Sequence, residues 1–183
     1  MTVDESGTTI DAATAVRGGA AGVGSFLLGY LFTFLSAADT GVRVAGAFQP
    51  LASAGGRFAP AWKVAGWLFL DGHAVGTRFD GRTVDAVSLA GVEFLYLVPP
   101  LLLVAAGALV AVTSASTTRR QGLVDGATVT VGYLLFVVVF AILTQHGNVR
   151  PTLLRALVVA GVAYPVAFGG LGGILAVVAR TDR

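Results

Sequence analysis

Residues 126–144 read GATVTVGYLLFVVVFAILT, a run of 19 residues without a single charge. A helix needs roughly 20 mostly apolar residues to cross a hydrocarbon layer about 30 Å thick, so this run predicts a transmembrane helix. Three further stretches meet the same requirement, at residues 18–38, 91–112 and 156–179. The sequence therefore predicts an all-α fold, a polytopic bundle of four transmembrane helices.

The composition supports the same class of protein. Of the 183 residues, 55% are hydrophobic and only 12% are charged, where a soluble domain carries about a quarter. High hydrophobicity with low charge excludes a disordered chain. The net charge of only +2 and the scattered basic residues exclude a nucleic-acid partner, and the lack of cysteine excludes disulfides and thiolate metal sites. We expect one integral membrane domain over residues 1–183, with the lipid bilayer around it.

Basic residues in short loops predict the orientation of such a protein, because they favour the cytoplasmic side. Five arginines fall before the first span, in the loop between the second and third, and in the tail: Arg17, Arg119, Arg120, Arg180 and Arg183. An even number of spans places them on one side, so both termini, including the tail 1–17, are expected in the cytoplasm. Arg150 and Arg155 lie on the opposite side and weaken this bias. The predicted location is the cell membrane, as a multi-pass protein.

Residues 39–90 form one long outer loop that holds nine of the 22 charged residues. Inside it lies an apolar island, PAWKVAGWLFL at residues 60–70, which is too short to cross a membrane and fits an interfacial or re-entrant helix. Trp62 and Trp67 are expected at the level of the lipid headgroups. The island is interpreted either as a cover on the outer end of the bundle or as a lid over a substrate path.

Few residues are candidates for chemistry. Glu93 lies just inside the outer end of the second span, where it either faces headgroups and water or lines a cavity and binds a proton or a cation. His73 and His146 fall in outer loops. Two histidines can ligate a haem from opposite sides, but a lone histidine in each of two loops is more often an ordinary loop residue. We expect no catalytic residues, no metal and no cofactor, and hence no enzyme.

Helix breakers and small residues are the remaining signals. Pro99 and Pro100 in the second span and Pro165 in the fourth predict bends, because proline lacks a backbone donor and clashes with the preceding turn. Such breaks expose backbone groups in transporters, although they also shape bundles of every other class. Small-residue pairs let helices approach closely, within one chain or between chains; the pairs here are Gly18 with Gly22 and Gly169 with Gly173.

Four segments together resemble a family of small, uncharacterised multi-pass membrane proteins of halophilic archaea, which are sometimes loosely labelled transporters. The segments are Gly29-Tyr30-Leu31, Trp62-Lys63-x-x-Gly66-Trp67-Leu68-Phe69 with His73 following, Tyr96-Leu-Val-Pro-Pro-Leu-Leu-Leu103, and Tyr164-Pro165-x-x-Phe168-Gly169. The resemblance covers about residues 18–178. It implies a four-helix membrane protein with an outer tryptophan-containing segment, and it transfers no catalytic residues.

Two functions fit these observations. The first is a non-catalytic subunit or scaffold of a larger membrane complex, which would contact other membrane subunits or further copies of itself. The alternative is a small transporter or channel-like protein that acts as an oligomer. An ion pore normally shows charged rings or polar linings, and the spans here carry almost no charge. The sequence therefore favours the subunit.

Overall fold

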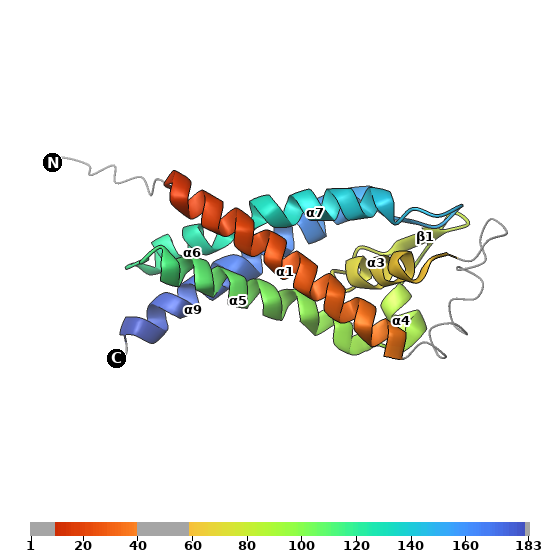
Figure 1. Cartoon of the computed structure of the whole chain (residues 1–183), viewed down its shortest axis with the longest axis horizontal. Helices are drawn as coiled ribbons and strands as arrows, with labels where there is room; N and C mark the ends of the chain where they lie inside the picture. Colours follow the sequence, from red (N-terminus) through yellow and green to blue (C-terminus); the bar gives the residue numbers. More distant parts are fainter. Residues whose placement is uncertain (1–9, 40–58, 182–183) are drawn as a thin grey trace.

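The computed structural model describes residues 10–39 and 59–181. It contains four helices that are long and apolar enough to cross a membrane: Ala12–Ala37, Glu93–Thr113, Arg119–Leu143 and Leu153–Thr181. They run along the long axis of the molecule, and the first long helix begins at the same end at which the fourth one finishes (Figure 1). We call this the tail end, and we call the opposite end, where the β-strands lie, the sheet end.

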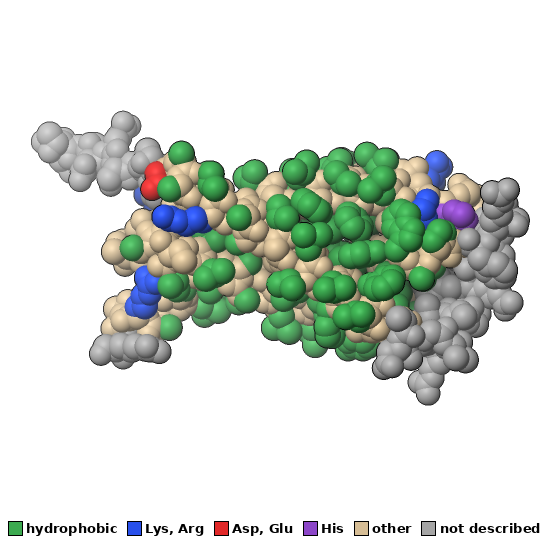
Figure 2. All heavy atoms as spheres, in the orientation of Figure 1, with side chains coloured by type: hydrophobic (Ala, Val, Ile, Leu, Met, Phe, Trp, Pro, Cys, Tyr) green, Lys and Arg blue, Asp and Glu red, His purple; other side chains and the backbone are tan. Residues whose placement is uncertain are grey.

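The surface supports the prediction of apolar spanning helices. Many large apolar side chains are exposed, among them Leu101, Val131 and Leu154 at 65%, 66% and 72%. Figure 2 shows hydrophobic side chains over the middle of the visible face, with charged and histidine side chains gathered at its two ends. A soluble monomer rarely exposes apolar surface of this extent.

Three of the long helices contain irregular segments. The first is the continuous α1 (Ala12–Asp39), whereas the second joins a 3-10 helix, η1 (Glu93–Leu97), to α5 (Val98–Thr113). The third consists of α6 (Arg119–Ala127) and α7 (Thr130–Leu143). The fourth begins with α8 (Leu153–Arg155), continues through two π-helical segments and ends as an α-helix; these are η2 (Ala156–Ala163), η3 (Pro165–Gly169) and α9 (Gly170–Thr181).

The first and third helices begin earlier than the predicted boundaries at residues 18 and 126. α1 begins at Ala12 because the Asp11 carboxylate accepts a hydrogen bond from the Thr14 amide at 2.5 Å and so caps the first turn. α6 begins at Arg119 because the Thr118 hydroxyl accepts from the Gln121 amide. Hydropathy detects the apolar part of a helix, but it does not detect capped polar turns at the ends.

The prediction of an all-α fold is wrong in one respect, because the sheet end carries a small antiparallel sheet. Its strands are β1 (Thr77–Phe79), β2 (Arg82–Val84) and β3 (Arg150–Pro151), in the order β2-β1-β3. Asp80 and Gly81 both have positive φ, as a two-residue hairpin turn requires. The strands have only two or three residues each, too few to show an alternating pattern in the sequence.

Two short helices complete the sheet end, α3 (Ala61–Asp71) and α4 (Ala86–Ala90). α3 packs against α1 and α7, and it also contacts α4. Phe26, Phe69 and Tyr133 belong to the main core, whereas Trp67 and Val87 belong to a second core under the sheet end. Residues 40–58 of the predicted loop 39–90 lie outside the described residues, but its described part from residue 59 onward contributes structure of its own to the bundle.

Candidate functional site

α3 enters the bundle beside α7. Near its beginning, the Lys63 ammonium donates a hydrogen bond to the Gln145 carbonyl at 2.5 Å, and the Trp67 indole donates to the Thr144 carbonyl at 2.8 Å. Beyond its end, the His73 ring reaches the Tyr133 hydroxyl. Thr144 and Tyr133 are separated by roughly 16 Å of helix at 1.5 Å per residue. α3 therefore lies along α7, which is compatible with either predicted alternative, an interfacial or a re-entrant helix.

His73 lies at the deep end of this segment and is fully buried. Its Nδ1 lies 2.8 Å from the Phe69 carbonyl oxygen and its Nε2 lies 2.6 Å from the Tyr133 hydroxyl. Burial lowers the pKa of His73 to about 4, so the ring is neutral near pH 7. A carbonyl only accepts, so Nδ1 carries the proton and Nε2 accepts from the Tyr133 hydroxyl. The Tyr164 ring lies 5.2 Å from the imidazole.

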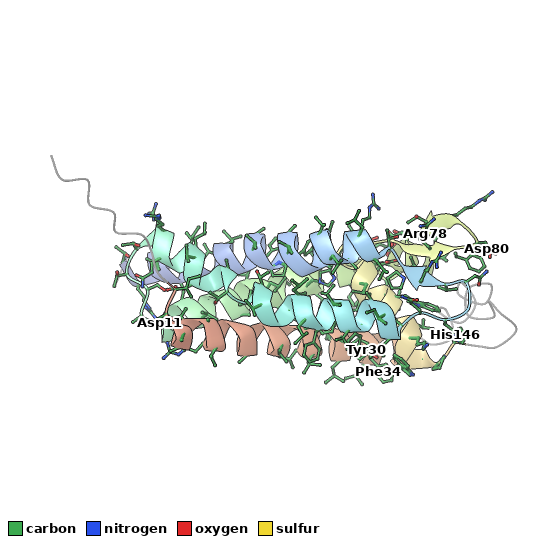
Figure 3. The ribbon with its side chains drawn as sticks, turned by 90° about the horizontal axis from the view of Figure 1, so that it is seen from above. Asp11, Tyr30, Phe34, Arg78, Asp80 and His146 are labelled. Atoms are coloured by element: carbon green, nitrogen blue, oxygen red, sulfur yellow. The ribbon has the colours of Figure 1, made fainter. Side chains whose placement is uncertain are left out.

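This arrangement restricts the chemistry open to His73. Both of its ring nitrogens already have hydrogen-bond partners within the chain, so ligation of a haem iron requires one of these bonds to break. His146 lies at the sheet end together with Arg78 and Asp80, while Asp11 lies at the tail end (Figure 3). Across residues 10–39 and 59–181, no group of three or more His, Cys, Asp or Glu side chains could hold a metal ion.

A second buried polar group lies next to His73 in the sequence. Asp71 is only 1% exposed, and its carboxylate accepts hydrogen bonds from the Ala86 amide at 2.7 Å and the Thr77 hydroxyl at 3.2 Å. Burial is the largest cause that raises its pKa, to about 7. Asp71 and His73 are therefore two buried titratable groups whose pKa values are shifted strongly in opposite directions, a feature that is common at functional sites.

The two tryptophans differ in their surroundings. Trp62 is 39% exposed, with the Lys63 ammonium 5.3 Å from its ring centroid, whereas Trp67 is fully buried. The expectation that both rings lie at the headgroup level stays a prediction. Trp67 is covered by the protein because residues 64–70 are apolar on every side of the helix, and such a helix is buried rather than laid on a surface.

The remaining predicted site residues lie apart from His73. Glu93 is exposed at the start of η1. Pro99 and Pro100 occupy the first turn of α5, where a missing amide removes no helical hydrogen bond. The second helix thus changes from 3-10 to α geometry at Val98, next to the two prolines at which a bend was expected. Pro165 begins the π-helical segment η3, so the fourth helix is irregular where a bend was expected.

The predicted packing glycines each lie at a close approach between helices. A Cβ atom on Gly18 or Gly22 would clash with the chain around Thr128 and Val129, where α6 gives way to α7. Equivalent atoms on Gly169 and Gly173 would clash with α6 at Gly126 and Gly122. The sequence identified the small residues but not their partners, because a glycine pattern carries no information on the facing helix.

Asp71, Asp85, Tyr133 and Tyr164 were not predicted as site residues. Asp71 had one usable signal, since it ends an apolar run whose composition is that of a buried helix. Tyr133 and Tyr164 are tyrosines inside predicted spans, where a hydroxyl needs a partner. Tyr133 is 60 positions from His73 and Tyr164 is 91 positions from it, so no local pattern in the sequence contains these contacts.

The model of a protein family, described as Family of unknown function (DUF7978), matches residues 2–180. The chain belongs to this family. No curated protein and no solved structure matches the chain. The DUF7978 match includes the four long helices, the short helix α3 and the sheet, so the whole site lies within the extent of the family.

Proposed function

We propose that this DUF7978 protein is an integral membrane protein that acts as a non-catalytic subunit or scaffold of a larger membrane complex. A groove between α1 and α5 carries the proposal. It consists of two adjoining hollows of about 490 and 250 Å³, which share Leu28 and Leu102. We propose that a transmembrane helix of a partner subunit occupies this groove.

The lining of the groove suits a helix. Its end toward the sheet is formed by large apolar side chains: Leu28, Leu31, Phe32, Leu35, Val98, Leu101 and Leu102. Its other end is formed mainly by small residues, including Ala21, Gly24, Ser25 and Ala105. Small residues allow two helix backbones to approach closely in lipid. From Ala21 to Leu35 the groove follows α1 for roughly 21 Å at 1.5 Å per residue, about two-thirds of the hydrocarbon thickness.

Gly24 and Gly19 are the two glycines of α1 with open space around them, and of these only Gly24 lines the groove. A Cβ atom on Gly24 would meet nothing within 4 Å, whereas one on Gly18 or Gly22 would clash with another helix. Glycine inside a helix costs about 0.8–1.0 kcal/mol relative to alanine. Contacts within the described chain do not require glycine at this position, and the close approach of a partner helix would require it.

The test is a substitution that fills the groove with a large side chain, followed by a measurement of how much partner protein still co-purifies. Gly24→Leu is expected to reduce a membrane partner that co-purifies in mild detergent by about tenfold, equivalent to 1.4 kcal/mol of lost affinity. Ala167→Leu, an exposed position in η3 outside the groove, is the matched control and should leave the yield of partner unchanged. Equal yields from both variants, or a pure homo-oligomer from the native chain, would contradict the proposal.

For the orientation we propose that the tail end, with both termini, is cytoplasmic and the sheet end lies outside. The chain has no cysteine, so single cysteines can report on each side. An impermeant maleimide added to intact cells is expected to label Arg82→Cys in the exposed β2 and to leave Arg119→Cys at the start of α6 unlabelled. The reverse pattern would overturn the assignment.

The second candidate is a small transporter. It would act as an oligomer, because four helices are few for a translocation path. It is favoured by the buried pair of His73 and Tyr133 and by the π-helical η2 and η3, since irregular helices often occur at functional sites. The same homo-oligomer that would contradict the subunit proposal supports this one.

We also propose a halophilic archaeal source, in line with a single lysine among the 12 lysine and arginine residues.

A further inference from the structure

The three short strands at the sheet end place two arginines directly opposite each other. In the register of the sheet, Arg78 of β1 pairs with Arg150 of β3 on one side and with Thr83 of β2 on the other. Directly paired residues of antiparallel strands project from the same face, and neighbouring strands lie about 4.8 Å apart. Thr83, Arg78 and Arg150 therefore form a row across one face of the sheet, which we call the arginine row.

The arginine row lies on the outward face of the sheet, at the end of the molecule where Figure 3 labels Arg78. Its three residues are exposed, whereas Thr77 and Pro151, which project from the opposite face, are buried. Like charges directly opposite each other destabilise a pair of antiparallel strands. Among the residues that the structure describes, neither guanidinium forms an ion pair with a carboxylate. An anion between the two guanidinium groups would offset their repulsion.

The carboxylates around the arginine row have partners of their own. Asp80, in the hairpin turn after β1, accepts a hydrogen bond from the side chain of Asn148, which precedes β3. Asp71 and Asp85 line a cavity of about 280 Å³ together with Arg155, whose charge offsets part of theirs. The two guanidinium groups of the row therefore keep a net positive charge beside the single carboxylate of Asp80.

Arg155 marks the membrane boundary next to the row. Leu153 and Leu154, which begin the fourth long helix, are 46% and 72% exposed, as side chains that face lipid are. Arg155 follows them and is also exposed, and the end of such a side chain reaches the headgroup level. Its Nη1 lies 3.8 Å, and the Thr83 methyl group 2.6 Å, from the position that a Cβ atom on Gly76 would occupy. The headgroup level therefore passes beside the row.

The path of the chain from β3 into the fourth helix gives the same level. Only Pro151 and Thr152 separate Arg150 from Leu153, the first residue of that helix. Three residues of extended chain span at most about 10 Å, and the polar layer on each side of a bilayer is roughly 5–7 Å deep. The guanidinium of Arg150, at the end of a long flexible side chain, can therefore reach the lipid phosphates.

We propose that the arginine row binds the phosphate group of an anionic lipid in the membrane leaflet at the sheet end. Guanidinium groups bind phosphate through paired, charge-assisted hydrogen bonds, and the Thr83 hydroxyl is a further donor beside them. The bound phosphate replaces the repulsion between Arg78 and Arg150 by two attractions. This inference rests on the membrane location in the proposed function, but not on the partner subunit, because the groove lies between α1 and α5.

A fluorophore on the hairpin reports on lipid at the row in the full chain, reconstituted in phosphatidylcholine nanodiscs. Arg82→Cys carries it, because Arg82 is exposed in β2 and pairs outside the row. The quenchers are phosphatidylglycerol and phosphatidylcholine with the same nitroxide-labelled acyl chain. The anionic quencher is expected to reach half-quenching at a mole fraction about fivefold lower, the selectivity that one arginine near a membrane surface provides. Equal quenching by both lipids would overturn the proposal, whereas no quenching by either would contradict the membrane location itself.

Two pairs of substitutions with the same change in charge locate the effect. Arg78→Gln with Arg150→Gln is expected to remove the preference for the anionic quencher. Arg119→Gln with Arg120→Gln, at the exposed start of α6 in the tail end, is the matched control and should keep the preference. Quenching by phosphatidylcholine should be equal in both variants, which checks that the hairpin keeps its place. A preference that survives the first pair, or is lost in the second, would contradict the assignment.

A competition measurement separates a lipid phosphate from a free anion. Millimolar inorganic phosphate is compared with chloride at the same ionic strength, so that both salts screen charge equally. The preference for the anionic quencher is expected to persist in both, because lipid headgroups are held at the surface at high local concentration. A preference that is lost in phosphate and kept in chloride would assign the arginine row to a soluble anion and overturn the lipid proposal.

Discussion

Gly22→Ala is expected to destabilise the bundle by about 1–3 kcal/mol, the usual effect of forcing extra atoms into a filled core. Gly24→Ala, two residues further along α1, is expected to stabilise it by up to about 1 kcal/mol. At Gly22 an added Cβ would clash with the Val129 carbonyl, which cannot withdraw without moving the start of α7. At Gly24 the added methyl group has open space, so only the gain in helix propensity remains.

The comparison is matched, since both substitutions add one methyl group to the same helix. Unfolding by SDS in mixed micelles, followed by circular dichroism, gives the change in the free energy of unfolding for each variant. Opposite signs for the two variants are the expected result. Two changes of the same sign would show that the contact between α1 and α7 is not as close as the structure has it.

The same two glycines show how far the sequence could predict the fold. The four apolar runs predict four long helices because crossing a hydrocarbon layer sets a minimum length that is visible in any one segment. The spacing of Gly18 and Gly22 marks one face of α1 for close contact. That spacing does not show which helix Gly22 faces or that Gly24 faces a groove, because both depend on where the other helices lie.

The candidate site was less predictable for a related reason. The apolar island at residues 60–70 indicates a short helix, but its depth depends on contacts from Lys63 and Trp67 to the end of α7. His73 was predicted as a candidate from its rarity, in a segment that looked like an outer loop. Its burial follows from the position of α3, and the shifted pKa values of His73 and Asp71 follow in turn from that burial.

The stability of the native chain is expected to change little with the ionisation of these two groups between about pH 4 and pH 6.5, because their contributions have opposite signs. Asp71 has a folded pKa of about 7, above its ordinary 3.8, so the folded chain holds a proton that the unfolded chain has lost. The contribution of Asp71 to the free energy of unfolding therefore falls as the pH rises. His73 has a folded pKa of about 4, below its ordinary 6.5, so the unfolded chain holds the extra proton and stability rises with pH.

Single substitutions should separate the two contributions. In Asp71→Asn only His73 of the two groups still titrates, and the stability of this variant relative to the native chain should increase from pH 4 to pH 7. In His73→Gln only Asp71 of the two still titrates, and the stability of this variant relative to the native chain should decrease over the same range. Each shift corresponds to about 3 kcal/mol at 1.36 kcal/mol per pKa unit. The measurement is the difference in free energy of SDS-induced unfolding between variant and native chain, which cancels the contributions of all other titrating groups.

The double variant provides the control. With both groups replaced, the difference from the native chain should again be nearly independent of pH, since the two opposing contributions are removed together. Flat difference curves for both single variants would mean that neither group is buried as described. If only one of the two difference curves has a slope, the group replaced in the variant with the flat curve is the one that remains in water. Mutual compensation follows from the position of both groups at one end of the same short helix. Each shifts the stability of the folded chain with pH, but together they leave it nearly unchanged.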